Sequence, residues 1–177
     1  MRPQAKFALI ALILFAPIAC AQHDKRDPLT ESQVSQIREA GIYPAERIRL
    51  YTKFIDEHAE KIKSLAKHGR SPSRTQQLDD QLQDYTALLD ELGSNLDQYS
   101  ERKADLRPAM KPLAEASAKW MGILRALAGE PGFDVSRKDA LEATDDIASE
   151  AARIQTEQNA YFATHKDEKG QQMAEPK

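Results

Sequence analysis

Among the side chains that could do chemistry, histidine is the one whose charge changes near neutral pH, and His58 lies among apolar residues at helical spacing. In such a place an imidazole can ligate a metal ion, bind haem or act as a pH switch. A metal site needs several converging ligands, but the sequence contains no Glu-x-x-His and no His-x-x-x-His pattern. We therefore predict neither a metal site nor a cofactor site, and we interpret His58 as a histidine in the core or at its boundary.

Pairs of adjacent carboxylates occur at Asp79–Asp80, Asp90–Glu91 and Asp145–Asp146. Two carboxylates that converge on one atom can perform acid–base catalysis or chelate a cation. Adjacent helical residues instead point about 100° apart, so these pairs are expected on solvated faces. The sequence also lacks a glycine-rich phosphate loop, a nucleophile elbow and a Ser/His/Asp arrangement. No catalytic residue is predicted, and we do not expect an enzyme.

The elements that must position these side chains are helices, and nothing in the sequence reads as a strand. Four segments carry apolar residues at alternating steps of three and four, which places them along one face of a helix. The second segment keeps this phase across Gly93, so we predict one continuous helix there. The segments run from about Pro44 to His68, from about Arg74 to Lys103 or Leu106, from after Asp105 to Gly129, and from about Asp134 or Ser136 to Phe162.

A shorter helix is expected before these four, from Glu31 to Ala40. Thr30 and Gln33 have the spacing of a capping box, in which each side chain bonds to the backbone N–H of the other residue. Leu29 and Val34 have the spacing of a hydrophobic staple across the same helix start.

Two boundaries of the long helices rest on weaker local signals. Ser73 with Gln76 three residues later has the spacing of a capping box at the start of the second long helix. Pro112 either starts the third long helix or kinks it, because a proline has no N–H to donate to the preceding turn.

Short connections make consecutive long helices antiparallel neighbours. We therefore predict an all-α fold, an elongated antiparallel four-helix bundle with a short additional N-terminal helix. The bundle domain covers residues 29–163 in this interpretation. A signal peptide at 1–21 and a flexible segment at 22–28 come before it, and a disordered polar tail at 164–177 follows it.

The long helices are expected to differ in length. At about 1.5 Å per residue the second helix is about 45–50 Å long and the third about 30 Å long. The apolar residues Leu96, Tyr99 and Leu106 would then lack cover from the third helix. We predict that the short N-terminal helix or a second copy of the chain covers them, which makes them a candidate interaction surface. The aromatic residues on the apolar faces are interpreted as core residues and are Tyr51, Tyr85, Tyr99, Trp120 and Tyr161.

Residues 1–21 read as a targeting segment, because a basic start precedes an apolar run too short to span a bilayer. Ala19-Cys20-Ala21 has the small-x-small pattern cleaved by the general signal peptidase, which places the mature start near Gln22. In the alternative interpretation, Cys20 is the lipidated first residue of a lipoprotein. Cys20 is the only cysteine, so no disulfide is expected in the mature chain. The leader predicts a periplasmic or secreted location.

The charge balance limits the classes of partner. Removing Arg2 and Lys6 with the leader leaves 23 basic and 28 acidic side chains. An acidic chain without a basic stripe is poorly suited to nucleic acid or to an anionic membrane surface. We expect a protein partner or self-association, and no membrane insertion after cleavage apart from the lipid anchor that Cys20 provides in the alternative.

The stretch Leu29-Thr30-Glu31-Ser32-Gln33 resembles the Leu-Thr-x-x-Gln motif of the Spy/CpxP periplasmic stress proteins. The resemblance covers only the residues from Leu29 to Arg38, and the sequence lacks a second copy of the motif. It implies a small exported α-helical protein with ATP-independent chaperone activity. The chain as a whole is similar to uncharacterised exported helical proteins of bacteria, a likeness that implies no activity.

Three functional hypotheses follow from these observations. The first is a non-enzymatic interaction or scaffold module of the cell envelope that contacts protein partners through its helix faces. The second is a chaperone or stress protein of the Spy/CpxP kind. The third is a helical bundle that binds a small ligand or a metal ion between its helices.

Overall fold

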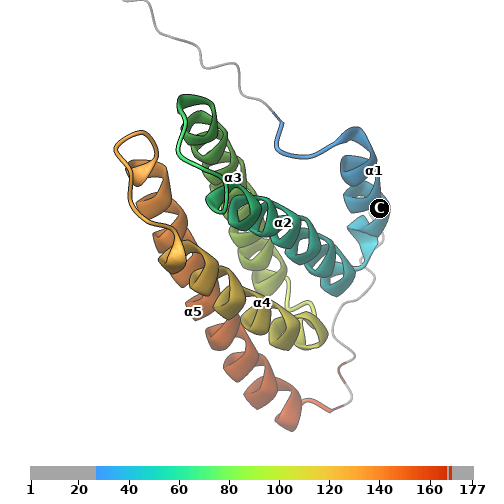
Figure 1. Ribbon diagram of the computed structural model, residues 1–177. Helices are drawn as coiled ribbons and strands as arrows, with labels where there is room; N and C mark the ends of the chain where they lie inside the picture. Colours follow the sequence, from blue (N-terminus) through green and yellow to red (C-terminus); the bar gives the residue numbers. More distant parts are fainter. Residues whose placement is uncertain (1–26, 167, 169–177) are drawn as a thin grey trace, which may run out of the picture.

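The computed structural model describes residues 27–166 and 168, and this part of the chain contains helices and no strand (Figure 1). The predicted all-α fold is confirmed. The predicted helices are present, with ends that differ from the expected ones by a few residues. They are α1 (Glu31–Glu39), the 3-10 turn η1 (Ala40–Ile42), α2 (Pro44–Ala66), α3 (Pro72–Glu101), α4 (Arg107–Ala126) and α5 (Asp134–Thr164).

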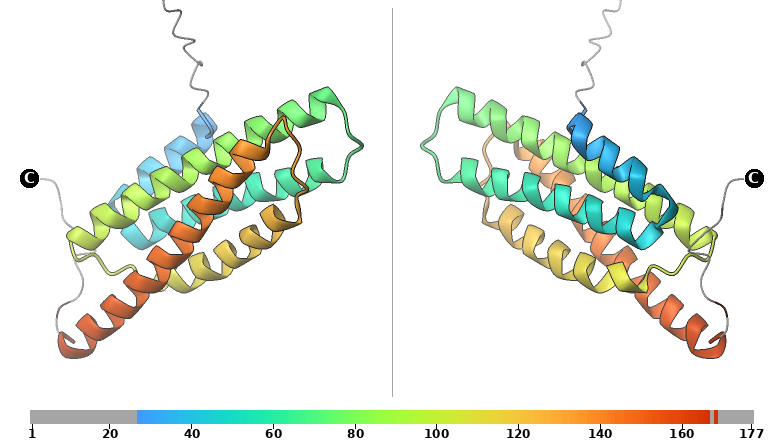
Figure 2. Two further views of the ribbon diagram at one scale, coloured as in Figure 1. Left: turned by 90° about the vertical axis from the view of Figure 1, so that its left-hand side faces the viewer. Right: turned by 90° about the vertical axis from the view of Figure 1, so that its right-hand side faces the viewer.

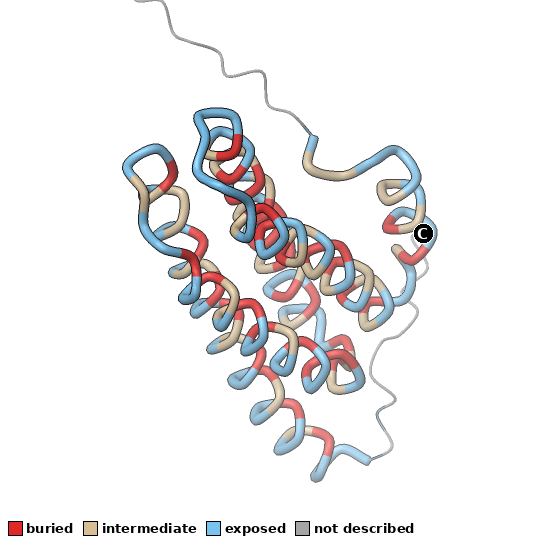
Figure 3. The backbone as a smooth tube through the Cα atoms, viewed as in Figure 1, coloured by how far each residue is buried: buried red, intermediate tan, exposed pale blue. Residues whose placement is uncertain are grey.

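The four long helices pack in a closed arrangement. Helix α2 packs against α3 and α4, and α5 packs against the same two helices from the other side. Helix α1 lies outside this arrangement and packs against α2 (Figure 2). The buried residues form a continuous stripe along each long helix, and these stripes face one another in the centre of the bundle (Figure 3).

The starts of α1 and α3 show how local sequence sets the helix boundaries. At α1 the predicted capping box is present, because the Gln33 N–H donates to Thr30 Oγ1 and the Thr30 N–H donates to Gln33 Oε1. At α3 the predicted cap at Ser73 is wrong. The helix begins earlier, with Ser71 as the cap and Pro72 in the first turn. A proline is tolerated there because the backbone N–H groups of the first turn have no partner within the helix.

Pro112 does not start α4 but lies inside it. It has no N–H to donate to the carbonyl of Pro108, four residues earlier. That carbonyl oxygen instead accepts a hydrogen bond of 3.0 Å from the guanidinium of Arg49, on α2. The free acceptor that the proline creates therefore ties the start of α4 to α2.

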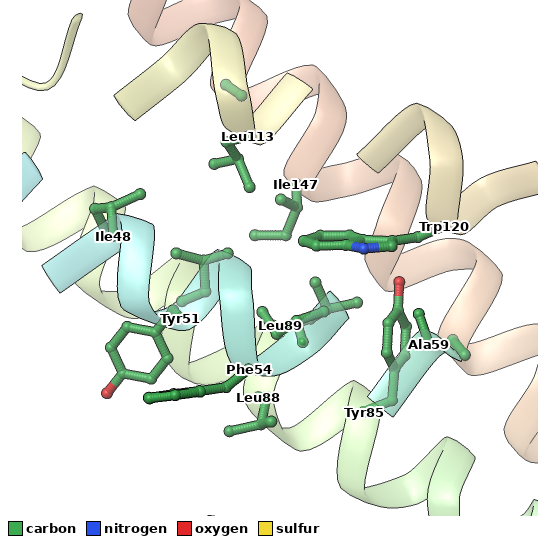
Figure 4. Packing of buried hydrophobic residues seen from close by; sticks show 14 of the residues in the cluster. Ile48, Tyr51, Phe54, Ala59, Tyr85, Leu88, Leu89, Leu113, Trp120 and Ile147 are labelled. Carbon is green, nitrogen blue, oxygen red and sulfur yellow. The ribbon is translucent and has the colours of Figure 1, made fainter. Parts of the chain in front are cut away.

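The centre of the core is built around Trp120 and Tyr85, whose rings meet edge to face at a centroid distance of 6.2 Å (Figure 4). Both polar atoms are satisfied, as burial of a polar group requires. The Trp120 N–H donates to Asp56 at 2.9 Å, and the Tyr85 hydroxyl lies 2.7 Å from Oγ1 of Thr144. Thr144 itself donates to the Ala140 carbonyl at 2.6 Å, so the tyrosine is the donor in its bond with Thr144.

Helix α3 continues through Gly93, as the phase of its apolar face predicted. An added Cβ at Gly93 would lie 3.5 Å from Cδ1 of Ile147 on α5, which is an ordinary van der Waals contact. The glycine is therefore not required by a close helix approach in this structure.

We expect Gly93→Ala to stabilise the protein by up to about 1 kcal/mol, because alanine loses less conformational entropy in a helix and fits beside Ile147. Gly122→Ala in α4 is the matched control, since a Cβ there has no neighbour within 4 Å. Urea denaturation of both variants measures the effect. If Gly122→Ala stabilises and Gly93→Ala destabilises, the α3–α5 contact is closer than described.

Candidate functional site

The three residues predicted as an interaction surface, Leu96, Tyr99 and Leu106, lie in the core of the single chain. Their exposed fractions are 0%, 5% and 0%. Helix α1 does not provide the cover, because it packs against α2. Helix α5 reaches this end of the bundle, because it packs against α3, its last turns extend past the start of α4 in Figure 2, and its Gln158 bonds to the backbone of Leu106. These three residues are therefore not an open surface, and no partner is needed to bury them.

Gln158 of α5 fixes the connection between α3 and α4. Its side chain is 9% exposed, its Oε1 accepts from the Leu106 N–H at 2.8 Å, and its Nε2 donates to the Ala104 carbonyl at 2.8 Å. One amide side chain thus satisfies a buried donor and a buried acceptor of the connecting loop. This contact brings Leu106 onto α5.

His58 lines a polar pocket of about 410 Å³ between the residues before α1, helix α2 and helix α3. Its Nε2 lies 3.2 Å from the carbonyl oxygen of Pro28. Because a carbonyl can only accept, Nε2 carries the proton of the neutral ring and Nδ1 keeps its lone pair. Pro28, assigned from the sequence to a flexible segment, is therefore bonded to α2.

Gln81 of α3 lines the same pocket and is 6% exposed. Its Nε2 donates to a carboxylate oxygen of Asp84 at 3.3 Å, which leaves Oε1 as an acceptor. Within the described residues, neither Oε1 of Gln81 nor Nδ1 of His58 has a hydrogen-bond partner. Sequence analysis missed Gln81, although its spacing from Leu78 and Tyr85 places it on the apolar face of α3.

The surroundings of His58 favour the neutral ring. Burial is the largest influence and lowers the pKa of His58 below its ordinary value, and the positive charge of Lys61 lowers it further. The Pro28 carbonyl, the Asp84 carboxylate and the Gln81 side chain act in the opposite direction but do not reverse the shift.

The largest exposed apolar side chains near one end of the bundle are Ile42 and Tyr43, which are 52% and 51% exposed. They lie in the corner between α1 and α2, where Tyr43 lines a pocket of about 310 Å³. The pocket wall combines apolar residues with charged residues at the rim. These residues are Tyr43, Pro44, Ala45, Glu46, Arg49, Asp105 and Pro108, and we call Ile42 together with them the apolar corner.

The acidic pairs predicted on solvated faces are exposed or partly exposed, and the fold also gathers carboxylates from separate helices. A groove of about 590 Å³ between α3 and α5 is lined by five of them, together with Gly93 and apolar residues. The five are Asp90, Asp97, Asp139, Glu142 and Asp146. Over residues 27–166 and 168, no group of three His, Cys, Asp or Glu side chains is placed to hold a metal ion.

The leader and Cys20, the residue predicted to be removed or lipidated, lie outside the described residues, as does most of the predicted tail. Within the described part, none of the helices combines the length and the hydropathy needed to cross a bilayer.

The fold and these sites define an all-α bundle with a polar pocket, an acidic groove and an apolar corner on its surface. Comparison of the chain with protein-family models, with curated proteins and with solved structures found no match. The resemblance of Leu29–Gln33 to the Spy/CpxP motif therefore stays a prediction.

We expect Gln158→Leu to destabilise the protein by about 2–4 kcal/mol, because the N–H of Leu106 and the carbonyl of Ala104 would both lose their buried partner. Gln155→Leu is the matched control, since Gln155 bonds only to Asn159 near the surface and its loss should cost less than about 0.5 kcal/mol. Urea denaturation monitored by circular dichroism compares the two. Equal effects would show that Gln158 does not hold the loop.

Proposed function

We propose that this protein is a non-enzymatic interaction module of the bacterial cell envelope, exported by its N-terminal leader, that binds a protein partner at the apolar corner. The observation that carries the proposal is the pair Ile42 and Tyr43, two large side chains that stay about half exposed at 52% and 51%. Over residues 27–166 and 168, the other large apolar side chains are buried or partly buried, apart from Val135 at 71%.

The chemistry of the corner suits a protein surface. Protein interfaces combine an apolar centre, often with an aromatic anchor, and a polar rim that fixes orientation. Tyr43 supplies the aromatic anchor, and the walls of the neighbouring pocket include Pro44 and Pro108. Glu46 and Asp105 place negative charge at the rim, and Arg49 places positive charge there.

The corner is also held in shape before any partner arrives. Arg49 donates to the Pro108 carbonyl at 3.0 Å and pairs with Glu46 at 3.1 Å, which joins α2 to the start of α4. Asp105 and Arg107 form a second ion pair at 2.7 Å beside it. A preorganised surface loses less conformational entropy when it binds, which favours a specific partner over nonspecific adhesion.

Site-specific photo-crosslinking in the native envelope tests the proposal. A photoreactive phenylalanine analogue at Tyr43 should capture one main protein species, while the same analogue at Val135, near the opposite end of the bundle, should not. Ile42→Asp should weaken the captured complex at least about tenfold, because central apolar anchors contribute about 2 kcal/mol or more. Ile42 is half exposed, so this variant should keep its stability.

The other outcomes separate the competing functions. Equal capture at Tyr43 and Val135 would contradict a specific corner. Capture of a heterogeneous set of unfolded clients at Tyr43 would favour the chaperone alternative, and capture of a second copy of the chain would favour self-association.

A further inference from the structure

The groove of about 590 Å³ between α3 and α5, which we call the acidic groove, combines an apolar base with charged walls. Its apolar lining includes Leu89 and Ile147, which are 1% and 5% exposed and therefore lie at its base. The five carboxylates named above are exposed and come from both helices. Lysine, arginine and histidine are absent from the lining that the described residues form.

The five carboxylates of the acidic groove have no partner among the described residues. None of them accepts a hydrogen bond or forms an ion pair there. Acidic residues of α5 outside the groove are paired instead. Arg153 bonds to both Glu150 and Glu157, and Asp134 pairs with Lys138 at 2.8 Å. Helix α5 therefore carries internal ion pairs before and after the groove, while the negative charge inside the groove stays available to an occupant.

The carboxylates are regularly spaced along both walls. Asp90 and Asp97 are seven residues apart on α3. Asp139 and Asp146 are seven residues apart on α5, with Glu142 between them. Seven residues correspond to about 10 Å along a helix axis. A further helix lying along the groove repeats at the same interval, so basic side chains at steps of three and four residues meet carboxylates on the two walls.

This negative charge is spread along the groove and is not gathered at one point. In the part of the chain that the structure describes, no three His, Cys, Asp or Glu side chains are placed to hold a single metal ion. A row of separate cations, as lysine or arginine side chains on one helix face provide, is complementary to charge spread over about 10 Å.

Gly93 leaves an open space at the base of the groove. A Cβ there would lie 3.5 Å from Cδ1 of Ile147 and would meet no other atom within 4 Å. A glycine inside a helix destabilises it relative to alanine, and the packing of α3 against α5 does not require one here. The missing side chain does make room between the two walls, where an apolar side chain of an occupant can enter.

We propose that the acidic groove is a docking site for a basic amphipathic helix of a protein partner. The occupant places an apolar side chain in the space at Gly93 and basic side chains beside the carboxylates of both walls. Helices bound in grooves are held by apolar anchors of this kind, with charged residues at the rim. The site is separate from the apolar corner, since no residue lines both, so its failure would leave the proposed function untouched.

Titration of the full chain with a synthetic helical peptide tests the docking site. The peptide carries lysines at steps of three and four residues on one face, with leucine and alanine between them, and a scrambled peptide of the same composition is its control. In about 0.01 M salt, fluorescence anisotropy should show saturable binding of the helical peptide, at least about fivefold tighter than that of the scrambled one. Binding should weaken severalfold in about 0.15 M salt, because exposed charges are screened.

Two double variants that remove the same charge from the same two helices locate the site. Asp90→Asn with Asp146→Asn should weaken binding about fivefold or more, because two exposed ion pairs are lost. Glu101→Gln with Asp145→Asn should change it less than about twofold, because both residues are exposed but lie outside the lining of the groove. All four side chains are exposed, so both variants should keep the fold of the unchanged protein.

A pair of glycine variants tests the apolar part of the site independently of charge. Gly93→Leu fills the space at the base of the groove and should weaken binding, whereas Gly122→Leu, where a Cβ has no neighbour within 4 Å, should not. Any one of three results would overturn the docking site. They are no saturable binding of the helical peptide, equal binding of the helical and scrambled peptides, and equal weakening by the two double variants.

Discussion

Each long helix of this protein carries an apolar stripe on one side, and the molecule depends on burying all four stripes against one another. The stripes meet around Trp120 and Tyr85. A core of this kind is stable only if the polar atoms carried into it find partners. Asp56 and Thr144 meet that requirement for the two aromatic residues, and each comes from a different helix. The arrangement of helices that buries the two aromatic rings is therefore also the one that brings their hydrogen-bond partners into place.

The polar pocket departs from this rule. His58 and Gln81 bring two acceptors out of contact with solvent without a matching donor among the described residues. A buried acceptor without a hydrogen-bond donor destabilises a rigid core. These two acceptors instead lie beneath α1, the helix with the least packing. The apolar corner lies at the other end of the same short helix, next to η1.

Sequence reasoning was most successful where the governing interactions are local. The capping box of Thr30 and Gln33 and the continuity of α3 through Gly93 both depend on residues within one or two helical turns. It failed at Ser73 because Ser71 followed by Pro72 is the stronger start signal. It also left Leu96, Tyr99 and Leu106 without cover, because helix lengths alone do not show the direction in which α5 crosses the bundle.

The sequence by itself determined the helices, their order and most residues of their apolar faces, because helical periodicity and caps are set by neighbours along the chain. Tyr161, expected in the core, is only partly buried, and Phe162 is buried instead. Only the tertiary structure decided that α5 covers the end of α3, that Arg49 uses the carbonyl left free by Pro112, and that Gln81 stands beside His58. These contacts join residues far apart in the sequence, and their formation depends on the crossing angles and offsets of packed helices. No local pattern encodes those quantities, so the candidate sites emerged only when the helices were placed against one another.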